Sequence, residues 1–174
     1  GSGTNQITIN PSNELSPSTE YYVKIDPTAF DDPAGNSYAG IVESWAQLGS
    51  DINGEGSSDY FGYSVSLSSD GSVLAIGGIY DDGSGSNSGH VRIYENNNGT
   101  WTQIGSDIDG EGSSDYFGWS VSLSGDGSVV AIGAQRDDDA AYDAGHVRIY
   151  ENNNGTWTQI GSDIDGEGSS DYFG

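Results

Sequence analysis

Residues 101–156 read WTQIGSDIDGEGSSDYFGWSVSLSGDGSVVAIGAQRDDDAAYDAGHVRIYENNNGT, and residues 45–100 carry the same pattern one period of 56 positions earlier (101 − 45). Residues 157–174 then copy residues 101–118 without a change. Low-complexity sequence does not keep an irregular pattern over such a distance, so the repeat is a structural unit. The sequence therefore predicts one repeat at 45–100, a second at 101–156 and the beginning of a third at 157–174.

Each repeat contains four short segments with the pattern of β-strands. Tyr63, Val65 and Leu67 alternate with serines, which is the period of a strand with one apolar face. The continuous apolar run Val73–Ile76 is typical of a strand that is buried on both faces. The other predicted strands lie at 91–94, 100–104, 119–123, 129–132, 147–150 and 157–160. The dipeptides Asp70-Gly71 and Asn98-Gly99 separate strands and favour tight hairpin turns, because glycine accepts positive φ.

Four short antiparallel strands per repeat are the plan of a β-propeller blade. The predicted fold class is therefore all-β, with antiparallel four-stranded propeller-type blades that each take one 56-residue repeat. A closed propeller has about four to eight blades. Two repeats and a fraction form an incomplete propeller, so we expect either a piece of a longer protein or a subunit that neighbouring chains complete.

The composition excludes several classes of function. The chain has 27 acidic and 4 basic residues, a formal net charge of −23, so it lacks a cationic surface for nucleic acid. It has no cysteine, which excludes disulfides, zinc–thiolate sites and cysteine nucleophiles. No apolar run approaches the roughly 20 residues of a transmembrane helix. High charge with few aliphatic residues is typical of disorder, but the aromatic content of 11% and the repeat favour a folded protein.

Two motifs in each repeat resemble those of a known family. Asp59–Gly62 (DYFG) is followed by Ala75–Gly78 (AIGG), and Asp115–Gly118 (DYFG) by Ala131–Ala134 (AIGA). These motifs resemble the FG-GAP repeat of integrin α-subunit propellers, and the GHVRIY strand is similar to bacterial and algal FG-GAP-like repeats. The resemblance covers residues 45–174. It implies a blade fold and an extracellular, adhesive or surface setting, and it implies no catalytic activity.

Residues 1–44 have a different pattern and are predicted to form a partial Ig-like β segment. The chain begins Gly1-Ser2-Gly3, which has the composition of a tag remnant. The following stretch is similar to the last third of a bacterial Ig-like domain of the S-layer type. The residues that carry this resemblance are Leu15, Pro17, Thr19, Tyr21, Asp32, Gly35 and Asn36. About 40 residues cannot bury an Ig-like core alone.

An acidic segment precedes each DYFG motif, and it is the richest candidate for a metal site. Oxygen-bearing side chains alternate there around glycines, and Ca²⁺ takes six to eight oxygen ligands in irregular geometry. The predicted calcium ligands are Asp51, Asn53, Glu55 and Asp59, with their equivalents Asp107, Asp109, Glu111, Asp115, Asp163, Asp165, Glu167 and Asp171. In the alternative interpretation, these residues only make turns, while Ile52 and Ile108 point into the core.

The resemblance to FG-GAP repeats does not imply a further calcium site of the integrin type. Calcium-binding integrin repeats have a long Asp-rich loop between the first two strands of a blade. Here the corresponding connections are Ser69–Gly71 and Gly125–Gly127, which are too short to wrap an ion. Another acidic cluster, in the loop after the second strand, contains Asp81, Asp82, Asp137, Asp138, Asp139 and Asp143. This loop could bind an ion or a ligand, or it could simply be solvated.

No catalytic arrangement stands out in the sequence, so the chain is predicted not to be an enzyme. His90 and His146 occupy equivalent positions, which indicates a structural role at the start of a strand. The first functional hypothesis is adhesion or surface architecture, with a protein or glycan ligand at a cell surface. The second is a fibre or ring subunit that self-associates through its incomplete blades. The third is a carbohydrate-binding module of a larger secreted protein, in which Tyr or Trp side chains stack on sugar rings.

Overall fold

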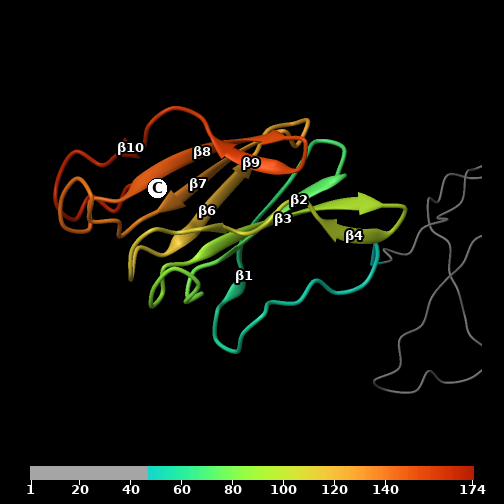
Figure 1. The fold of residues 1–174 in the computed structure, drawn as a ribbon, viewed down its shortest axis with the longest axis horizontal. Helices are drawn as coiled ribbons and strands as arrows, with labels where there is room; N and C mark the ends of the chain where they lie inside the picture. The colour runs from blue at the N-terminus through green and yellow to red at the C-terminus, as the bar shows by residue number, and fades with distance from the viewer. Residues whose placement is uncertain (1–46) are drawn as a thin grey trace, which may run out of the picture. The chain divides into compact units, whose positions relative to one another are not determined.

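The computed structural model describes residues 47–174 (Figure 1). The predicted Ig-like segment at 1–44 lies outside these described residues. Within residues 47–174 every regular element is a β-strand, and there is no helix long and apolar enough to cross a membrane. The predicted all-β fold with separate, unclosed blade sheets is confirmed.

The strands form two antiparallel sheets that correspond to two blades. The first sheet has the order β1-β2-β3-β4, and the short strand β5 pairs with β3 beside β4. Its strands are β1 (Phe61–Leu67), β2 (Val73–Gly78), β3 (His90–Asn97), β4 (Thr100–Gln103) and β5 (Ile108–Asp109). The second sheet repeats this arrangement with β6 (Phe117–Leu123), β7 (Val129–Ala134), β8 (His146–Asn153), β9 (Thr156–Gln159) and β10 (Ile164–Asp165).

The sheets and the sequence period are offset from one another. The first sheet begins at β1, in the middle of the 45–100 period, and takes β4 and β5 from the beginning of the next period. The second sheet likewise takes β9 and β10 from residues 157–174. Each sheet is therefore completed by the stretch of chain that leads into the following blade.

The predicted hairpin at Asn98-Gly99 is confirmed. Asn98 and Gly99 have φ of 54° and 89°, which is the double positive φ of a tight turn between β3 and β4. The connection from β1 to β2 is a longer turn, in which the Asp70 carboxylate accepts hydrogen bonds from Ser72 N (2.9 Å) and from the Ser68 hydroxyl (2.8 Å). Hydrogen bonds from Ser72 and Ser68 lower the pKa of Asp70 to about 2.

The apolar core lies between the two blades. It joins residues from both sheets, and Phe117 at the start of β6 is completely buried. The core residues are Ala75, Val91, Ile93, Ile108, Phe117, Val130, Ile132 and Ala134. The predicted inward position of Ile108 is confirmed, since this side chain is only 7% exposed.

Strand β6 lies against β1 and β2 and makes the joint between the blades. The Ser64 hydroxyl donates to the carbonyl of Gly118 (2.6 Å), and the Ser66 hydroxyl accepts from Leu123 N (3.0 Å). On the outer side of the blades, the indole of Trp157 donates to the carbonyl of Ile104 (3.0 Å). The alternating serines of β1 therefore face the next blade, and the repeated tryptophan ties the outer strand to the incoming chain.

The other face of β1 is uncovered. Val65 and Leu67 are 62% and 57% exposed, whereas their equivalents Val121 and Leu123 in β6 pack against the core. The difference has a simple cause: the first blade covers β6, and in residues 47–174 no blade covers β1. We call the exposed side chains of Tyr63, Val65 and Leu67 the β1 face.

Candidate functional site

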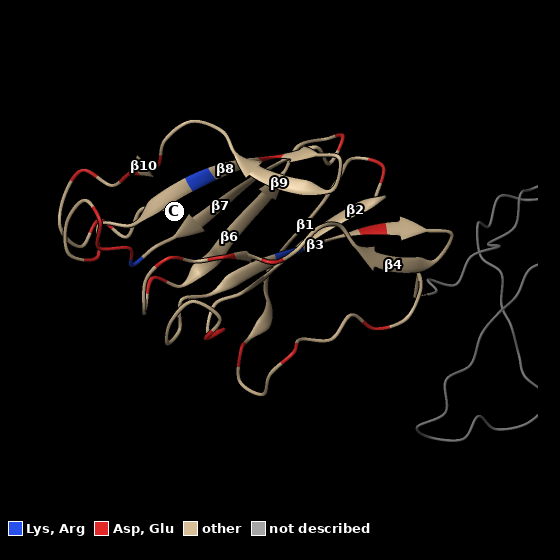
Figure 2. Cartoon of the chain, in the orientation of Figure 1, with Lys and Arg blue, Asp and Glu red and all other residues tan. Residues whose placement is uncertain are grey.

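The acidic residues gather in the connecting segments. Figure 2 shows them along the loops, while Arg92 and Arg148 lie within β3 and β8. We call residues 51–59, 107–115 and 163–171 the leader segments, because each leads into the DYFG motif at the start of a blade. They contain all of the predicted calcium ligands.

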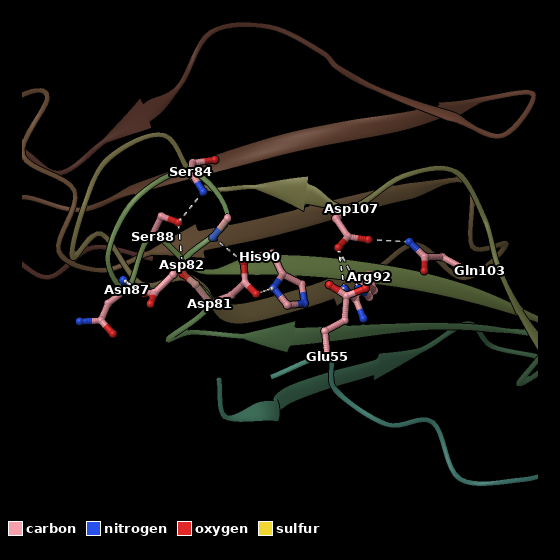
Figure 3. A network of polar contacts seen from close by, with 11 residues as sticks. Glu55, Asp81, Asp82, Ser84, Asn87, Ser88, His90, Arg92, Gln103 and Asp107 are labelled. Carbon is pink, nitrogen blue, oxygen red and sulfur yellow. Dashed lines mark hydrogen bonds and ion pairs between the residues drawn. The ribbon is translucent and has the colours of Figure 1, made fainter. Parts of the chain in front are cut away.

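Arg92 binds the carboxylates of two leader segments (Figure 3). Its Nε and one terminal nitrogen donate to Asp107 Oδ2 at 2.9 and 2.8 Å, and the same terminal nitrogen lies 2.5 Å from Glu55 Oε2. Gln103 donates to the other oxygen of Asp107 (2.6 Å). The Arg92 side chain is only 4% exposed, so the guanidinium is a buried charge that needs these partners.

Arg148 repeats this arrangement in the second blade. A terminal nitrogen donates to Glu111 (2.7 Å) and to Asp163 (2.6 Å), and Gln159 donates to the other oxygen of Asp163 (2.6 Å). The hydrogen bond from Arg148 lowers the pKa of Asp163. Burial works against ionisation of Asp107, but the hydrogen bonds from Arg92 and Gln103 hold its pKa below the ordinary value.

The predicted calcium ligands of the three leader segments fall into four groups by their contacts in the structure. Glu55, Asp107, Glu111 and Asp163 hold the two arginines. Asp51, Asn53 and Glu167 are exposed. Asp59, Asp115 and Asp171 fold back on a glycine three residues earlier, with hydrogen bonds from Gly112 and Gly168 N to the latter two. Asp109 and Asp165 pair across the strands with His90 and His146.

Asp115 is the most perturbed of these carboxylates. It is 6% exposed, and burial together with the nearby charges of Asp137 and Asp139 raises its pKa to about 6, against the hydrogen bond from Gly112. Burial disfavours the charged form of such a carboxyl, so Asp115 takes up a proton at a higher pH than an ordinary aspartate. The leader segment of the second blade therefore loses part of its negative charge at mildly acidic pH, near 6.

His90 and His146 begin β3 and β8, which confirms the predicted position at a strand start. Both are buried, at 0% and 1% exposed. Nδ1 of His90 lies 3.2 Å from Asp81 and Nδ1 of His146 lies 3.1 Å from Asp137. These contacts are not aligned hydrogen bonds, and neither ring nitrogen of either histidine has such a bond to the described residues.

Aromatic side chains from both blades contact one another in a row. Tyr80 makes edge-to-face contacts with Tyr60 (4.8 Å between centroids) and Tyr116 (5.3 Å). Arg136, the equivalent of Tyr80, lies over the rings of Tyr116 (5.4 Å) and Tyr172 (5.9 Å). Tyr60 is 61% exposed, because no blade precedes β1 in the described residues.

A cavity of about 520 Å³ opens beside this row in the first blade. Its walls combine tyrosine rings with oxygen-bearing side chains, and it is open to solvent. The lining residues are Ser57, Ser58, Asp59, Tyr60, Tyr80, Asp82, Asn87 and Tyr116.

Comparison with known families identifies this architecture. The profile of the FG-GAP repeat matches residues 53–94 and 106–150, which together make up half of the 174 residues. The protein belongs to the FG-GAP repeat family. The profile of a bacterial Ig-like domain matches residues 1–46, and both matches agree with the resemblances predicted above. No curated protein matches the chain at a significant level.

The FG-GAP blades place the sequence motifs in distinct roles. Phe117, the phenylalanine of the second DYFG motif, fills the joint between the blades, and the AIG segment is the buried middle strand. Sequence reasoning missed the partners of the arginines and histidines, because Arg92 and Asp107 are 15 positions apart and belong to no local motif. The repetition of both residues at 148 and 163 is the one signal that points to their pairing.

Proposed function

We propose that this chain is a non-enzymatic extracellular protein of adhesion or surface architecture, in which FG-GAP blades present loops to a protein or glycan at a cell surface. FG-GAP repeats and bacterial Ig-like domains are usually found in extracellular or surface proteins and are typically non-catalytic. Their combination in one chain supports this setting.

The observation that carries the proposal is where the two repeats differ. Residues 83–88, in the loop between β2 and β3, differ from residues 139–144, between β7 and β8, at every position. By contrast, β3 and β8 are identical in sequence. Variable loops on a constant scaffold are a common arrangement for binding surfaces.

Exchange of these loops tests the proposal. The protein, immobilised on beads, is tested against a panel of cells and extracellular matrix proteins, and we expect it to bind at least one of these targets. Replacement of residues 83–88 by the sequence of 139–144 should change which target is bound, while the thermal transition stays in place. Equal binding by the exchanged variant, or no binding to any target, would count against adhesion through this loop.

The cavity beside Tyr60 favours a glycan among the adhesion ligands. Tyrosine rings offer apolar faces, and Asp59, Asp82 and Asn87 offer groups that accept or donate hydrogen bonds to hydroxyls. A glycan array with Tyr60→Ala as the matched variant tests this ligand. A blank array for the unchanged chain would remove it.

Self-association through an incomplete blade is the second candidate function. It is favoured by the β1 face, whose apolar side chains correspond to residues that pack against a neighbouring blade in β6. Mass photometry of the chain over a range of concentrations tests this candidate, and a persistent monomer would exclude it.

Calcium binding by the leader segments stays a proposal. The carboxylates that do not hold an arginine are mostly exposed, and a net charge of −23 favours cation binding. A ligand that binds only the folded state raises its stability. The melting temperature should therefore be higher in millimolar Ca²⁺ than in chelator, and identical melting temperatures would exclude stabilisation by calcium.

A further inference from the structure

We propose a divalent metal site in the second blade, formed by His146, Asp163 and Asp165, that takes a first-row transition ion such as Zn²⁺ or Mn²⁺. One ring nitrogen of His146 and one carboxylate oxygen from each aspartate lie within 4.8 Å of one another. Within residues 47–174 this is the only such convergence of histidine and carboxylate groups. It unites two of the carboxylates in the leader segment with a histidine from the strand beside them.

The buried histidine is the observation that points to a ligand. His146 is 1% exposed, and neither of its ring nitrogens has an aligned hydrogen bond. A buried polar group without a partner is costly, so an unseen partner is expected. Nδ1 lies 3.1 Å from the carboxylate of Asp137, so we expect the proton on Nδ1 and the metal on Nε2. A carboxylate behind a histidine is the usual second shell of a metal-binding imidazole.

The two aspartates are held beside His146 by the sheet and by side chains. Asp165 in β10 is the direct cross-strand partner of His146 in β8. Asp163 receives hydrogen bonds from Gln159 and Arg148 on separate oxygens, which fixes its orientation while lone pairs remain for an ion. Asp165 is exposed, so an ion can reach the site from solvent and this side chain can move to close the shell.

The charges around the site favour a cation. The groups that face it are the carboxylates of Glu111, Asp115, Asp137, Asp163 and Asp165 and one cation, Arg148. Even with Asp115 protonated, the carboxylates outnumber the guanidinium. A divalent ion would reduce this excess of negative charge, which the single arginine leaves uncompensated.

The ligand atoms of the proposed site indicate which metal ions it would bind. Ca²⁺ prefers a shell of six to eight oxygens, whereas imidazole nitrogen with carboxylates suits zinc and other first-row transition ions. The predicted site is therefore distinct in chemistry from the calcium binding proposed for the leader segments.

The first blade offers an internal control. His90 and Asp109 pair in the same register, but His90, Asp107 and Asp109 do not converge to the same degree. In the first blade both Nε and a terminal nitrogen of Arg92 bind Asp107, whereas Nε of Arg148 has no partner and only a terminal nitrogen binds Asp163. The arginine holds its aspartate more completely in the first blade.

Isothermal titration of the chelator-treated chain with Zn²⁺, and the visible spectrum of the Co²⁺ form, test the site. We expect one ion per chain, a Co²⁺ spectrum with nitrogen and oxygen ligands, and at least about tenfold weaker binding for His146→Gln. His90→Gln should bind as the unchanged chain does. Asp165→Asn, an exposed substitution, should also weaken binding and gives a second test if His146→Gln does not fold.

Three results would overturn the proposal. They are the absence of Zn²⁺ and Mn²⁺ binding, binding that His146→Gln and Asp165→Asn leave unchanged, and equal loss of binding in His90→Gln. In the first of these cases, binding of Ca²⁺ alone would support calcium binding by the leader segments.

Discussion

At the scale of single residues, the two buried arginines connect parts of the chain that the sequence keeps apart. Arg92 holds Glu55 from the leader segment before its blade and Asp107 from the leader segment after it. The Asp107 side chain is 28% exposed and Glu55 is 69% exposed, so the two ion pairs differ in their access to water. The more buried pair should dominate the energetics.

We expect Arg92→Met to destabilise the protein by about 2–4 kcal/mol, because it leaves Asp107 without its charged partner in a half-buried position. Urea unfolding followed by tryptophan fluorescence measures this change. Glu55→Gln, which alters only the exposed pair, should cost less than about 1 kcal/mol. Similar losses for the two variants would show that the carboxylate of Asp107 does not depend on Arg92.

The raised pKa of Asp115 predicts a pH dependence with a defined sign. The native state binds this proton up to pH about 6 and the unfolded state only to its ordinary value of 3.8, so the contribution of Asp115 to stability falls as pH rises between these values. The free energy of unfolding of Asp115→Asn, relative to that of the unchanged chain, should therefore increase by about 2 kcal/mol when pH rises from 4 to 7. Urea unfolding at both pH values checks this, and a difference between the two proteins that is constant with pH would contradict it.

At the scale of elements, much of the architecture could be predicted from the sequence. The alternation at 63–67 and the apolar run at 73–76 appear as β1 and β2, because a strand pattern can be recognised over four or more residues. The strands β5 and β10 could not be predicted, because two residues have no periodicity. The exposure of the β1 face is also absent from the sequence pattern, since Val65 and Val121 lie in the same local motif and differ only in what covers them.

Two glycines have similar backbone geometry, but we expect them to differ in their tolerance to substitution. Gly89 and Gly99 have φ of 77° and 89°. A Cβ at Gly99 would meet nothing within 4 Å, so Gly99→Ala should cost about 1–2 kcal/mol from backbone strain alone. A Cβ at Gly89 would lie 2.7 Å from the backbone nitrogen of Phe117, which is fixed in the joint between the blades.

Gly89→Ala must therefore push the two blades apart, and we expect it to cost about 3 kcal/mol or more. Urea unfolding of the two variants side by side measures the difference. Equal losses of stability would mean that the joint at Phe117 is more deformable than its burial indicates.

At the scale of the whole molecule, the β1 face is exposed apolar surface: Val65 and Leu67 are more than half exposed, while Tyr63 contacts Trp119 (4.7 Å between ring centroids). The joint between the two blades shows how such a face can be covered. There the first blade, with the serines of β1 facing the second blade, packs on Val121 and Leu123. The second blade carries the same outward serines, Ser120 and Ser122, which are exposed. A second copy could therefore pack on the β1 face in the manner of the joint, as a head-to-tail contact.

The double substitution Val65→Ser and Leu67→Ser should reduce self-association while changing stability by less than about 1 kcal/mol, because both side chains are more than half exposed. Sedimentation velocity over a range of concentrations checks this. Tyr142→Ser is the matched control, since it removes an aromatic side chain that is 68% exposed on the loop after β7. Equal effects of the control and the double variant would exclude the β1 face as the contact.

The offset between sheet and sequence period has a consequence for how such a protein can grow. The period 101–156 contains the end of the first sheet and most of the second, so it is not a folding unit with edges of its own. A duplication of one 56-residue period, wherever in the repeat it begins, adds one sheet together with one complete joint between sheets. Blade number can therefore change by recombination between repeats without a new interface, and the identical strands β3 and β8 are what such copying leaves behind.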